Sequence, residues 1–317
     1  MRRHFLKAAA GAVLAFGLGS GAMADGHGWK PEGPIKLMIA FAAGGGADTQ
    51  ARLIAADIEA ATGWKIIPEQ VTGKGGINAV LALKDAPADG TAMAMIVTET
   101  LGYNAAAAKG AGISPGDFAG LTTTAGFQMG VVSKADKGWK TMEDVVAAAK
   151  GGQDIRFGVM SPKLGDLAFL LGEAMGVEFN IVSVKGGKAV MNGMQAGDLD
   201  VGFMAGIQRK GVASGDLVNL ASALSAPLVQ TPDAKTLADL GVPYSADGYF
   251  VLVAPAGIPD EARTALTDAI VAAAKSGKAS EMITKAFGGS VTITGAKLDK
   301  LLAEGFTSAG ALMEAAQ

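Results

Sequence analysis

The chain has 317 residues, of which 50% are hydrophobic and 18% charged, enough for one large or two modest globular domains and too apolar for a disordered protein. It contains no cysteine, which excludes disulfides, thiolate nucleophiles and thiolate-bound zinc, and its two histidines, His4 and His27, precede the first expected strand, which argues against histidine-based catalysis and multi-histidine metal sites. A net charge of -3 and an aromatic content of 6% argue against a nucleic-acid-binding protein, which needs a clustered basic surface.

Residues 1–24 have the order of an export signal. Arg2 and Arg3 precede an apolar stretch over residues 8–18, and small residues around Ala24 follow it. The apolar stretch is shorter than the ~18 to 20 residues that span a bilayer, which disfavours a permanent anchor. We therefore expect cleavage after Ala24 and a periplasmic protein. The arginine pair resembles a twin-arginine signal but lacks the usual polar residue before it, so both that route and general export remain open.

After the export signal the chain alternates between strand and helix patterns. Short apolar runs predict strands over residues 35–41, 65–71 and 91–97. Glycine-rich loops and amphipathic patterns between them predict helices over residues 49–62 and 78–86. This alternation favours a parallel sheet, in which ligands bind beside the carboxyl ends of the strands.

The same alternation returns in the second half of the chain. We predict helices over residues 141–150, 164–175 and 187–196 and strands over residues 155–159, 179–184 and 199–204. The C-terminal part adds a helix near 259–276, a short segment near 281–287, a strand at 291–294 and a helix from 297.

Two segments, residues 126–133 and 249–255, would connect these units. We therefore predict an α/β fold with two lobes, joined by two crossings, and a ligand cleft between the lobes. Lobe 1 is expected to contain residues 25–130 plus 250–317, and lobe 2 residues 131–249.

The loop over residues 42–49 is the first candidate for ligand binding. Its three glycines expose backbone amides where a helix begins, an arrangement that suits an anion. A tight turn in which Asp48 caps the helix is the alternative. The Gly-x-Gly pattern followed by Glu69 also resembles a dinucleotide-binding motif, although Thr49 stands where the third glycine belongs. An exported nicotinamide-dependent oxidoreductase is therefore the alternative function.

Three further loops could complete a polar site. Glycines and lysines at 185–188 expose amides and add charge, or form a solvated turn. Ser161 and Lys163 offer a hydroxyl and a charge, or serve as a helix cap and a surface lysine. Thr98 and Asn104 follow the third strand, where exposed loop polarity is the simpler interpretation of the neighbouring Glu99. Gly-x-Ser-x-Gly is absent, and neither Ser133 nor Ser161 has lysine three residues later, so hydrolysis is not supported.

An ordered set of short motifs resembles the periplasmic substrate receptors of tripartite tricarboxylate transporters, the Bug-type solute-binding proteins. The resemblance covers nearly all of the chain after the export signal. The motifs lie at residues 34–41, 44–48, 72–78, 86–90, 185–187, 197–201 and 253–257.

The resemblance implies a two-lobed periplasmic-binding fold of type II-like topology. It also implies a carboxylate held between the lobes by backbone amides, hydroxyls and ordered water. The candidate ligand-binding residues, from the loops and the resemblance together, are Phe41, Ala43, Gly44, Gly45, Gly46, Asp48, Thr49, Thr98, Asn104, Ser161, Lys163, Lys185, Gly186, Gly187 and Met204.

Several positions depart from the family pattern. Ala42 and Ala43 stand where relatives often carry proline, and Phe203-Met204-Ala205 stands where they commonly carry Phe-Asp-Asn. Lys163 could compensate an extra carboxylate, or Met204 could indicate a more apolar ligand. We expect a monomeric, non-enzymatic receptor without cofactor or metal that delivers a small organic carboxylate to membrane transporter subunits. A sensor subunit that presents the ligand to a signalling partner is a further alternative.

Overall fold

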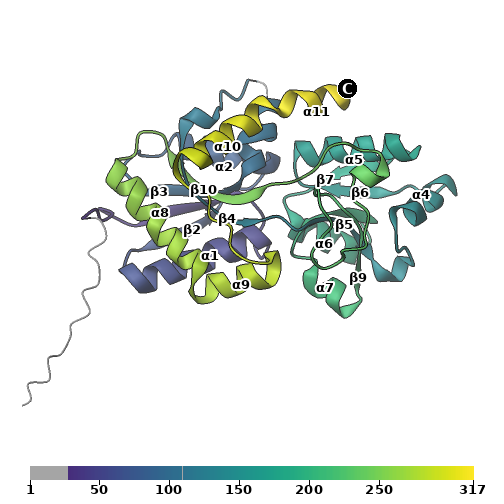
Figure 1. The fold of residues 1–317 in the computed structure, drawn as a ribbon, viewed down its shortest axis with the longest axis horizontal. Coiled ribbons are helices and arrows are strands. Elements are labelled where there is room, and N and C mark those ends of the chain that lie inside the picture. The colour runs from purple at the N-terminus through teal and green to yellow at the C-terminus, as the bar shows by residue number, and fades with distance from the viewer. Residues whose placement is uncertain (1–27, 109) are drawn as a thin grey trace, which may run out of the picture.

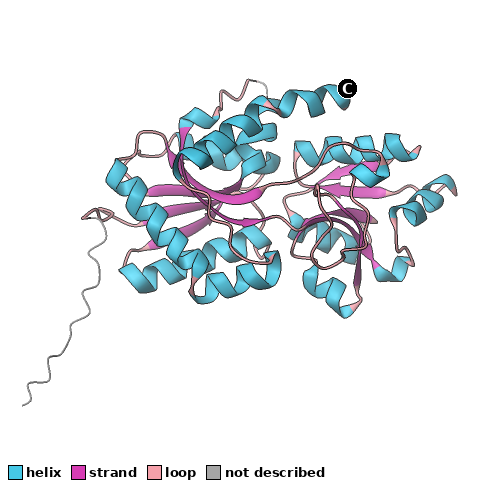
Figure 2. Cartoon of the chain, viewed as in Figure 1, coloured by secondary structure: helices cyan, strands magenta, loops and turns pink. Residues whose placement is uncertain are grey.

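The computed structural model describes residues 28–108 and 110–317; the expected export signal lies outside them. The described chain forms two α/β lobes that lie side by side, each built on a five-stranded sheet with helices on both faces (Figures 1 and 2). Over these residues we find no helix with the length and apolarity that a membrane crossing requires.

The first sheet has the strand order β2-β1-β3-β10-β4. β1 pairs in parallel with β2 and β3, whereas β10 is antiparallel to both β3 and β4. All six residues of β3 are buried, as expected for a central strand that is covered on both faces. Its strands are β1 (Ile35–Ile39), β2 (Ile66–Gln70), β3 (Ala92–Val97), β4 (Phe118–Gly126) and β10 (Tyr249–Pro255).

The second sheet repeats this arrangement in the order β7-β6-β8-β5-β9. β6 is parallel to β7 and β8, and β5 is antiparallel to β8 and β9. In each sheet the antiparallel fourth strand follows a connection from the other lobe. The strands are β5 (Met129–Lys134), β6 (Arg156–Val159), β7 (Asn180–Ser183), β8 (Val201–Ala205) and β9 (Leu217–Ser222).

Helices cover both faces of each sheet (Figure 1). In the first lobe, α1, α8 and α9 lie on one face and α2 and α10 on the other; in the second lobe, α5 lies opposite α6 and α7. The helices are α1 (Gly46–Thr62), α2 (Ile77–Lys84), α3 (Ala105–Ala107), α4 (Met142–Lys150), α5 (Pro162–Met175), α6 (Gly187–Ala196), α7 (Arg209–Ser214), α8 (Asp260–Lys275), α9 (Gly277–Phe287), α10 (Gly295–Thr307) and α11 (Ala309–Ala315).

The predicted two-lobed α/β fold is confirmed, with three corrections. Both sheets are mixed rather than parallel, because the crossing segments are themselves the antiparallel strands β5 and β10. β4, β9 and α7 were not predicted from the sequence. The predicted strand at 291–294 is wrong. This segment runs along β4, but the hydroxyl of Thr123 donates to the carbonyl of Val291 and accepts from the amide of Ile293. These two backbone groups are therefore not available for a regular ladder between strands.

A buried carboxylate fixes the start of β6 in the second lobe. Asp200 is 2% exposed and accepts hydrogen bonds from the backbone amide and the guanidinium of Arg156 and from Lys137 Nζ, the last at 2.6 Å. Burial raises the pKa of Asp200, but the hydrogen bonds from Arg156 and Lys137 outweigh it and lower that pKa to about 2. The ionised form therefore stabilises the folded lobe.

We expect Asp200→Asn to lower the free energy of unfolding by roughly 2 kcal/mol at neutral pH. Because the folded pKa of Asp200 is depressed, its contribution is fully present above about pH 4, the ordinary aspartate pKa, and is lost as the pH falls toward 2. Urea denaturation of both proteins as a function of pH measures this difference. Asp136→Asn, which removes an exposed carboxylate paired with Lys134, is the control and should change the free energy by less than about 1 kcal/mol. Equal losses in the two variants would contradict the assignment.

Candidate ligand-binding site

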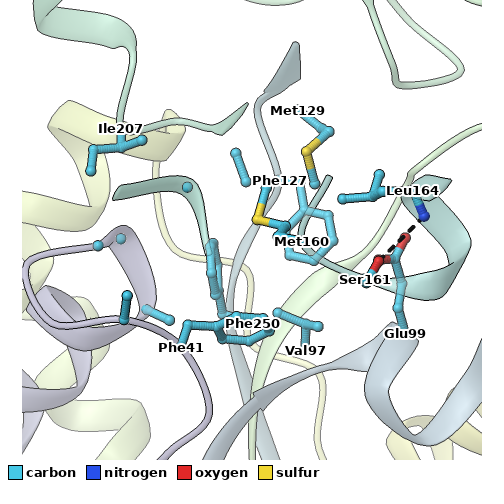
Figure 3. A pocket seen from close by; sticks show the side chains of 16 residues that line it. Phe41, Val97, Glu99, Phe127, Met129, Met160, Ser161, Leu164, Ile207 and Phe250 are labelled. Carbon is cyan, nitrogen blue, oxygen red and sulfur yellow. Dashed lines mark hydrogen bonds between the residues drawn. The ribbon is translucent and has the colours of Figure 1, made fainter. Parts of the chain in front are cut away.

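A small cavity lies where the two lobes face each other, with a volume of about 50 Å³. Phe41 and Ile207 lie toward one end and Ser161 and Glu99 toward the other, with aromatic and methionine side chains between them (Figure 3). The wall is therefore apolar along its middle. The lining residues are Phe41, Ala42, Gly45, Gly46, Ala47, Val97, Glu99, Phe127, Met129, Met160, Ser161, Leu164, Gly187, Ala205, Ile207 and Phe250.

The first wall is the loop between β1 and α1. Asp48 is 4% exposed and turns back onto this loop, where it accepts hydrogen bonds from the amide of Gly44 and Nε of Arg52, each at 2.8 Å, and from the side chain of Gln70. Asp48 thus holds the loop rather than lining the cavity. α1 starts without a side-chain cap, so the N–H groups of its first turn are available to a ligand. Gly45 and Gly46, where this helix begins, line the cavity.

The second wall is the loop between β7 and α6. This ten-residue helix also starts without a side-chain cap, and its first residue, Gly187, lines the cavity. Gly186 has a φ of +118°, and a Cβ there would lie 3.3 Å from the backbone nitrogen of Ala42. The two loops touch directly, because the amide of Ala42 donates to the carbonyl of Lys185 at 3.0 Å. Two helix N-termini from opposite lobes, each carrying about half a positive charge, therefore meet at one cavity.

The opposite end of the cavity carries an ion pair between the lobes. The side chain of Glu99 is 6% exposed, that of Lys163 is 15% exposed, and Lys163 Nζ lies 2.9 Å from Glu99 Oε1. Burial raises the pKa of Glu99, and the ammonium of Lys163 opposes this effect. Beside this pair, Tyr103 donates a hydrogen bond to Asp166 across the same boundary. The lobes are thus in contact on both sides of the cavity.

A basic groove adjoins the cavity beyond Ile207. We use this name for the groove lined by Arg209 and Lys210 of lobe 2 and by Lys278, Lys285 and one carboxylate, Glu281, of α9. The glycines of the first loop also line it. All four cations are exposed, and in the described part of the chain none of them has an ion-pair partner. On an acidic protein such a groove attracts anions to the site.

The structure brings some of the predicted site residues together and places others elsewhere. Phe41, Gly45, Gly46, Ser161 and Gly187 line the cavity. Of the remaining predicted residues, Gly44 and Thr49 line the basic groove, and Thr98 and Lys163 line a groove on the hinge side. Asp48 holds the first loop, Ala43 lies in that loop outside the lining, and Lys185 and Gly186 contact Ala42. Asn104 is buried against Gly75, and Met204 is fully buried in the lobe 2 core.

Most of the residues of the apolar wall were not predicted from the sequence. Val97, Phe127, Met160 and Phe250 belong to strands or lie at their ends, where an apolar side chain cannot be distinguished from core by local pattern. Their position at the ends of predicted strands was the available signal. Glu99, interpreted as exposed loop polarity, is in fact buried, because α5 of the other lobe covers it.

The fold and the site define a two-lobed solute-binding receptor. The chain belongs to the family described as "Tripartite tricarboxylate transporter family receptor", whose profile matches residues 50–317. The "UPF0065 protein in gbd 5'region" of Cupriavidus necator is 28% identical over 278 residues, 84% of this chain and 83% of that protein. The family predicted from the sequence motifs is confirmed.

Solved structures share the fold. MatC from Rhodopseudomonas palustris, with bound malate, superposes with a TM-score of 0.78 at 19% identity, over 91% of this chain and 100% of that one. Rpa4515 from R. palustris, with adipate, has a TM-score of 0.78 at 21% identity, over 90% of this chain and 98% of that one. At these identities the likeness establishes the two-lobed architecture.

We expect Asp48→Asn to loosen the first loop, because the Gly44 amide and the Arg52 guanidinium lose a charged acceptor. Amide exchange over residues 42–46 should become at least about tenfold faster, with a loss of stability of about 1–3 kcal/mol. Hydrogen–deuterium exchange with mass spectrometry and urea denaturation measure both effects. Glu69→Gln is the matched control, since Glu69 forms an exposed ion pair with Lys36 on the neighbouring strands. Unchanged exchange in Asp48→Asn would show that the carboxylate does not hold the loop.

Proposed function

We propose that this chain is a non-enzymatic periplasmic receptor that closes over a small organic carboxylate and delivers it to the membrane subunits of a tripartite tricarboxylate-type transporter. The observation that carries this proposal is the meeting of the uncapped N-termini of α1 and α6 at one cavity. The two oxygens of a carboxylate can accept amide hydrogens from both lobes at once, so the ligand itself links the lobes.

The size and wall of the cavity favour a small acid with a short apolar body. A volume of about 50 Å³ corresponds to roughly three to five water-sized positions at ~10 to 15 Å³ each. Each charge-assisted hydrogen bond contributes ~1.5 to 3 kcal/mol, so three or four of them offset the cost of closure and give roughly micromolar affinity. The malate and adipate bound to the two structural neighbours support a carboxylate ligand.

Capture would occur by hinge closure between residues 25–130 plus 250–317 and residues 131–249. The strands of the first sheet come from residues 35–126 and 249–255, and those of the second from residues 129–222, which supports this division. In this scheme the Ala42–Lys185 hydrogen bond and the Glu99–Lys163 ion pair form as the lobes close.

The location and the absence of catalysis belong to the same proposal. Residues 1–24 would direct export and be removed after Ala24, and the family is one of transporter receptors. Ser161 accepts a hydrogen bond from the amide of Leu164 as the cap of α5, which supports a structural role rather than that of a nucleophile. The family match favours a receptor over the exported nicotinamide-dependent oxidoreductase.

The direct test is a panel of small hydroxy, keto, amino and dicarboxylic acids in thermal-shift and calorimetric titrations. We expect micromolar binding of at least one acid, and about 2.7 kcal/mol of stabilisation at one hundred times its Kd. Gly187→Val should abolish that binding with the fold intact, because a Cβ at this helix start lies 3.3 Å from Ile207 and narrows access to the amides. Gly165→Ala, on α5 outside the cavity, is the control. No response from the whole panel would contradict the proposed function.

The basic groove should raise the association rate of an anionic ligand. We expect the double variant Lys278→Gln/Lys285→Gln to lower the association rate constant severalfold at low ionic strength and to leave dissociation nearly unchanged. Stopped-flow fluorescence at two salt concentrations measures this effect, which 1 M salt should remove. Lys297→Gln/Lys300→Gln on α10 removes the same charge elsewhere. Equal rates for both double variants would exclude steering by the groove.

A further inference from the structure

The two ends of the cavity offer a ligand opposite chemistry. One end presents backbone amides from α1 and α6, which are donors. The other end presents Glu99 and Ser161, which both line the cavity there (Figure 3). Phe127, Met160 and Phe250 separate the two ends. A ligand whose carboxylate sits on the amides therefore points its far end at Glu99 and Ser161.

Glu99 is a buried carboxylate of which only one oxygen is paired with Lys163. Lys163 Nζ lies 2.9 Å from Oε1, so the ion pair occupies that oxygen, and in the part of the chain that the structure describes we find no hydrogen bond to the other oxygen, Oε2. Glu99 lines both the cavity and the groove on the hinge side, whereas Lys163 lines only that groove. A ligand in the cavity thus meets the carboxylate and not the ammonium. The side chain is 6% exposed, so little water reaches Oε2, and a donor on the ligand would gain more here than at an exposed site.

The charge at this end is already balanced. Glu99 and Lys163 form a buried pair, so a ligand that brings a second carboxylate or an ammonium would add an uncompensated charge in a place with little solvent. A neutral hydroxyl avoids that cost. It can donate to Glu99 and accept from Ser161, whose Oγ receives the Leu164 amide at 3.3 Å and keeps its own proton to give.

We propose that Glu99 is the specificity-determining residue of this site and selects a small carboxylate whose far end carries a neutral hydroxyl group. This inference rests on the proposed function, because it takes the helix N-termini as the carboxylate end. The body of the ligand spans the apolar middle of the cavity, and its hydroxyl donates to Glu99. A dicarboxylate of the same length binds more weakly.

The test compares three matched series by calorimetry on the wild-type chain. These are ω-hydroxy acids of three to five carbons, the acids in which a methyl group replaces the hydroxyl, and the dicarboxylates of the same chain length. We expect at least one hydroxy acid to bind about tenfold or more tightly than its methyl and dicarboxylate counterparts. Equal affinities, or a dicarboxylate as the tightest ligand, would overturn the inference and leave the carboxylate receptor standing. No binding in any series would count against the proposed function itself, and the inference would fall with it.

Variants then assign the preference to Glu99. Glu99→Met/Lys163→Met removes both members of the pair together, so no buried charge is left unpaired. We expect this variant to lose the preference for the hydroxyl and to bind the methyl-ended acid at least as tightly as the hydroxy acid. Lys300→Gln/Glu304→Gln removes an exposed pair on α10 and should keep the wild-type order. A hydroxyl preference that persists without Glu99 would overturn the assignment. Should the double Met variant fail to fold, Glu99→Gln gives the same comparison, with a severalfold weaker preference expected.

Discussion

The site depends on the close approach of two backbone loops across the boundary between the lobes. The Ala42 amide reaches the Lys185 carbonyl only because Gly186 has no side chain and a φ of +118°. One backbone hydrogen bond contributes ~0.5 to 1.5 kcal/mol net, and a buried ion pair such as Glu99–Lys163 contributes little after desolvation. These two contacts are therefore too weak to fix the arrangement of the loops by themselves. In the proposed function, a ligand that bonds to both lobes adds free energy to this arrangement, so binding and closure are coupled.

The connections between the lobes explain why the two glycine loops lie at a defined position relative to each other. β5 and β10 each enter a sheet as an internal antiparallel strand directly after crossing from the other lobe. Only Phe127 and Gln128 separate β4 from β5, and the amide of Phe127 donates to Gly248 on the second crossing at 2.9 Å. The hinge thus consists of two short segments that are bonded to each other and anchored in both sheets. In the proposed closure, two such segments would restrict the relative motion of the lobes and bring the two glycine loops to one place.

Local sequence patterns were sufficient for the alternating units and for the glycine loops. The run at 35–41 and the helix at 49–62 were predictable because period and punctuation are local properties. β4 was not predictable, because three consecutive threonines are typical of an exposed segment. In the structure they are buried, and Thr124 donates a hydrogen bond to Gln50 of α1. The cavity wall was not predictable either, because Met160 and Phe250 become a wall only when the lobes meet. Glu99 is the clearest case: its burial depends on Lys163 and α5, far away in the chain, and no local motif encodes that contact.

The end of β8 contributes one residue to the core of lobe 2 and one to the wall of the cavity. Side chains alternate along a strand, so Met204 packs into the core against α6 while Ala205 faces the cavity. An amide at position 205 would give this wall a donor and an acceptor, whereas alanine leaves it apolar. The polar recognition that this wall lacks must come from elsewhere on the lining, and the side chains that offer it are Glu99 and Ser161 at the far end.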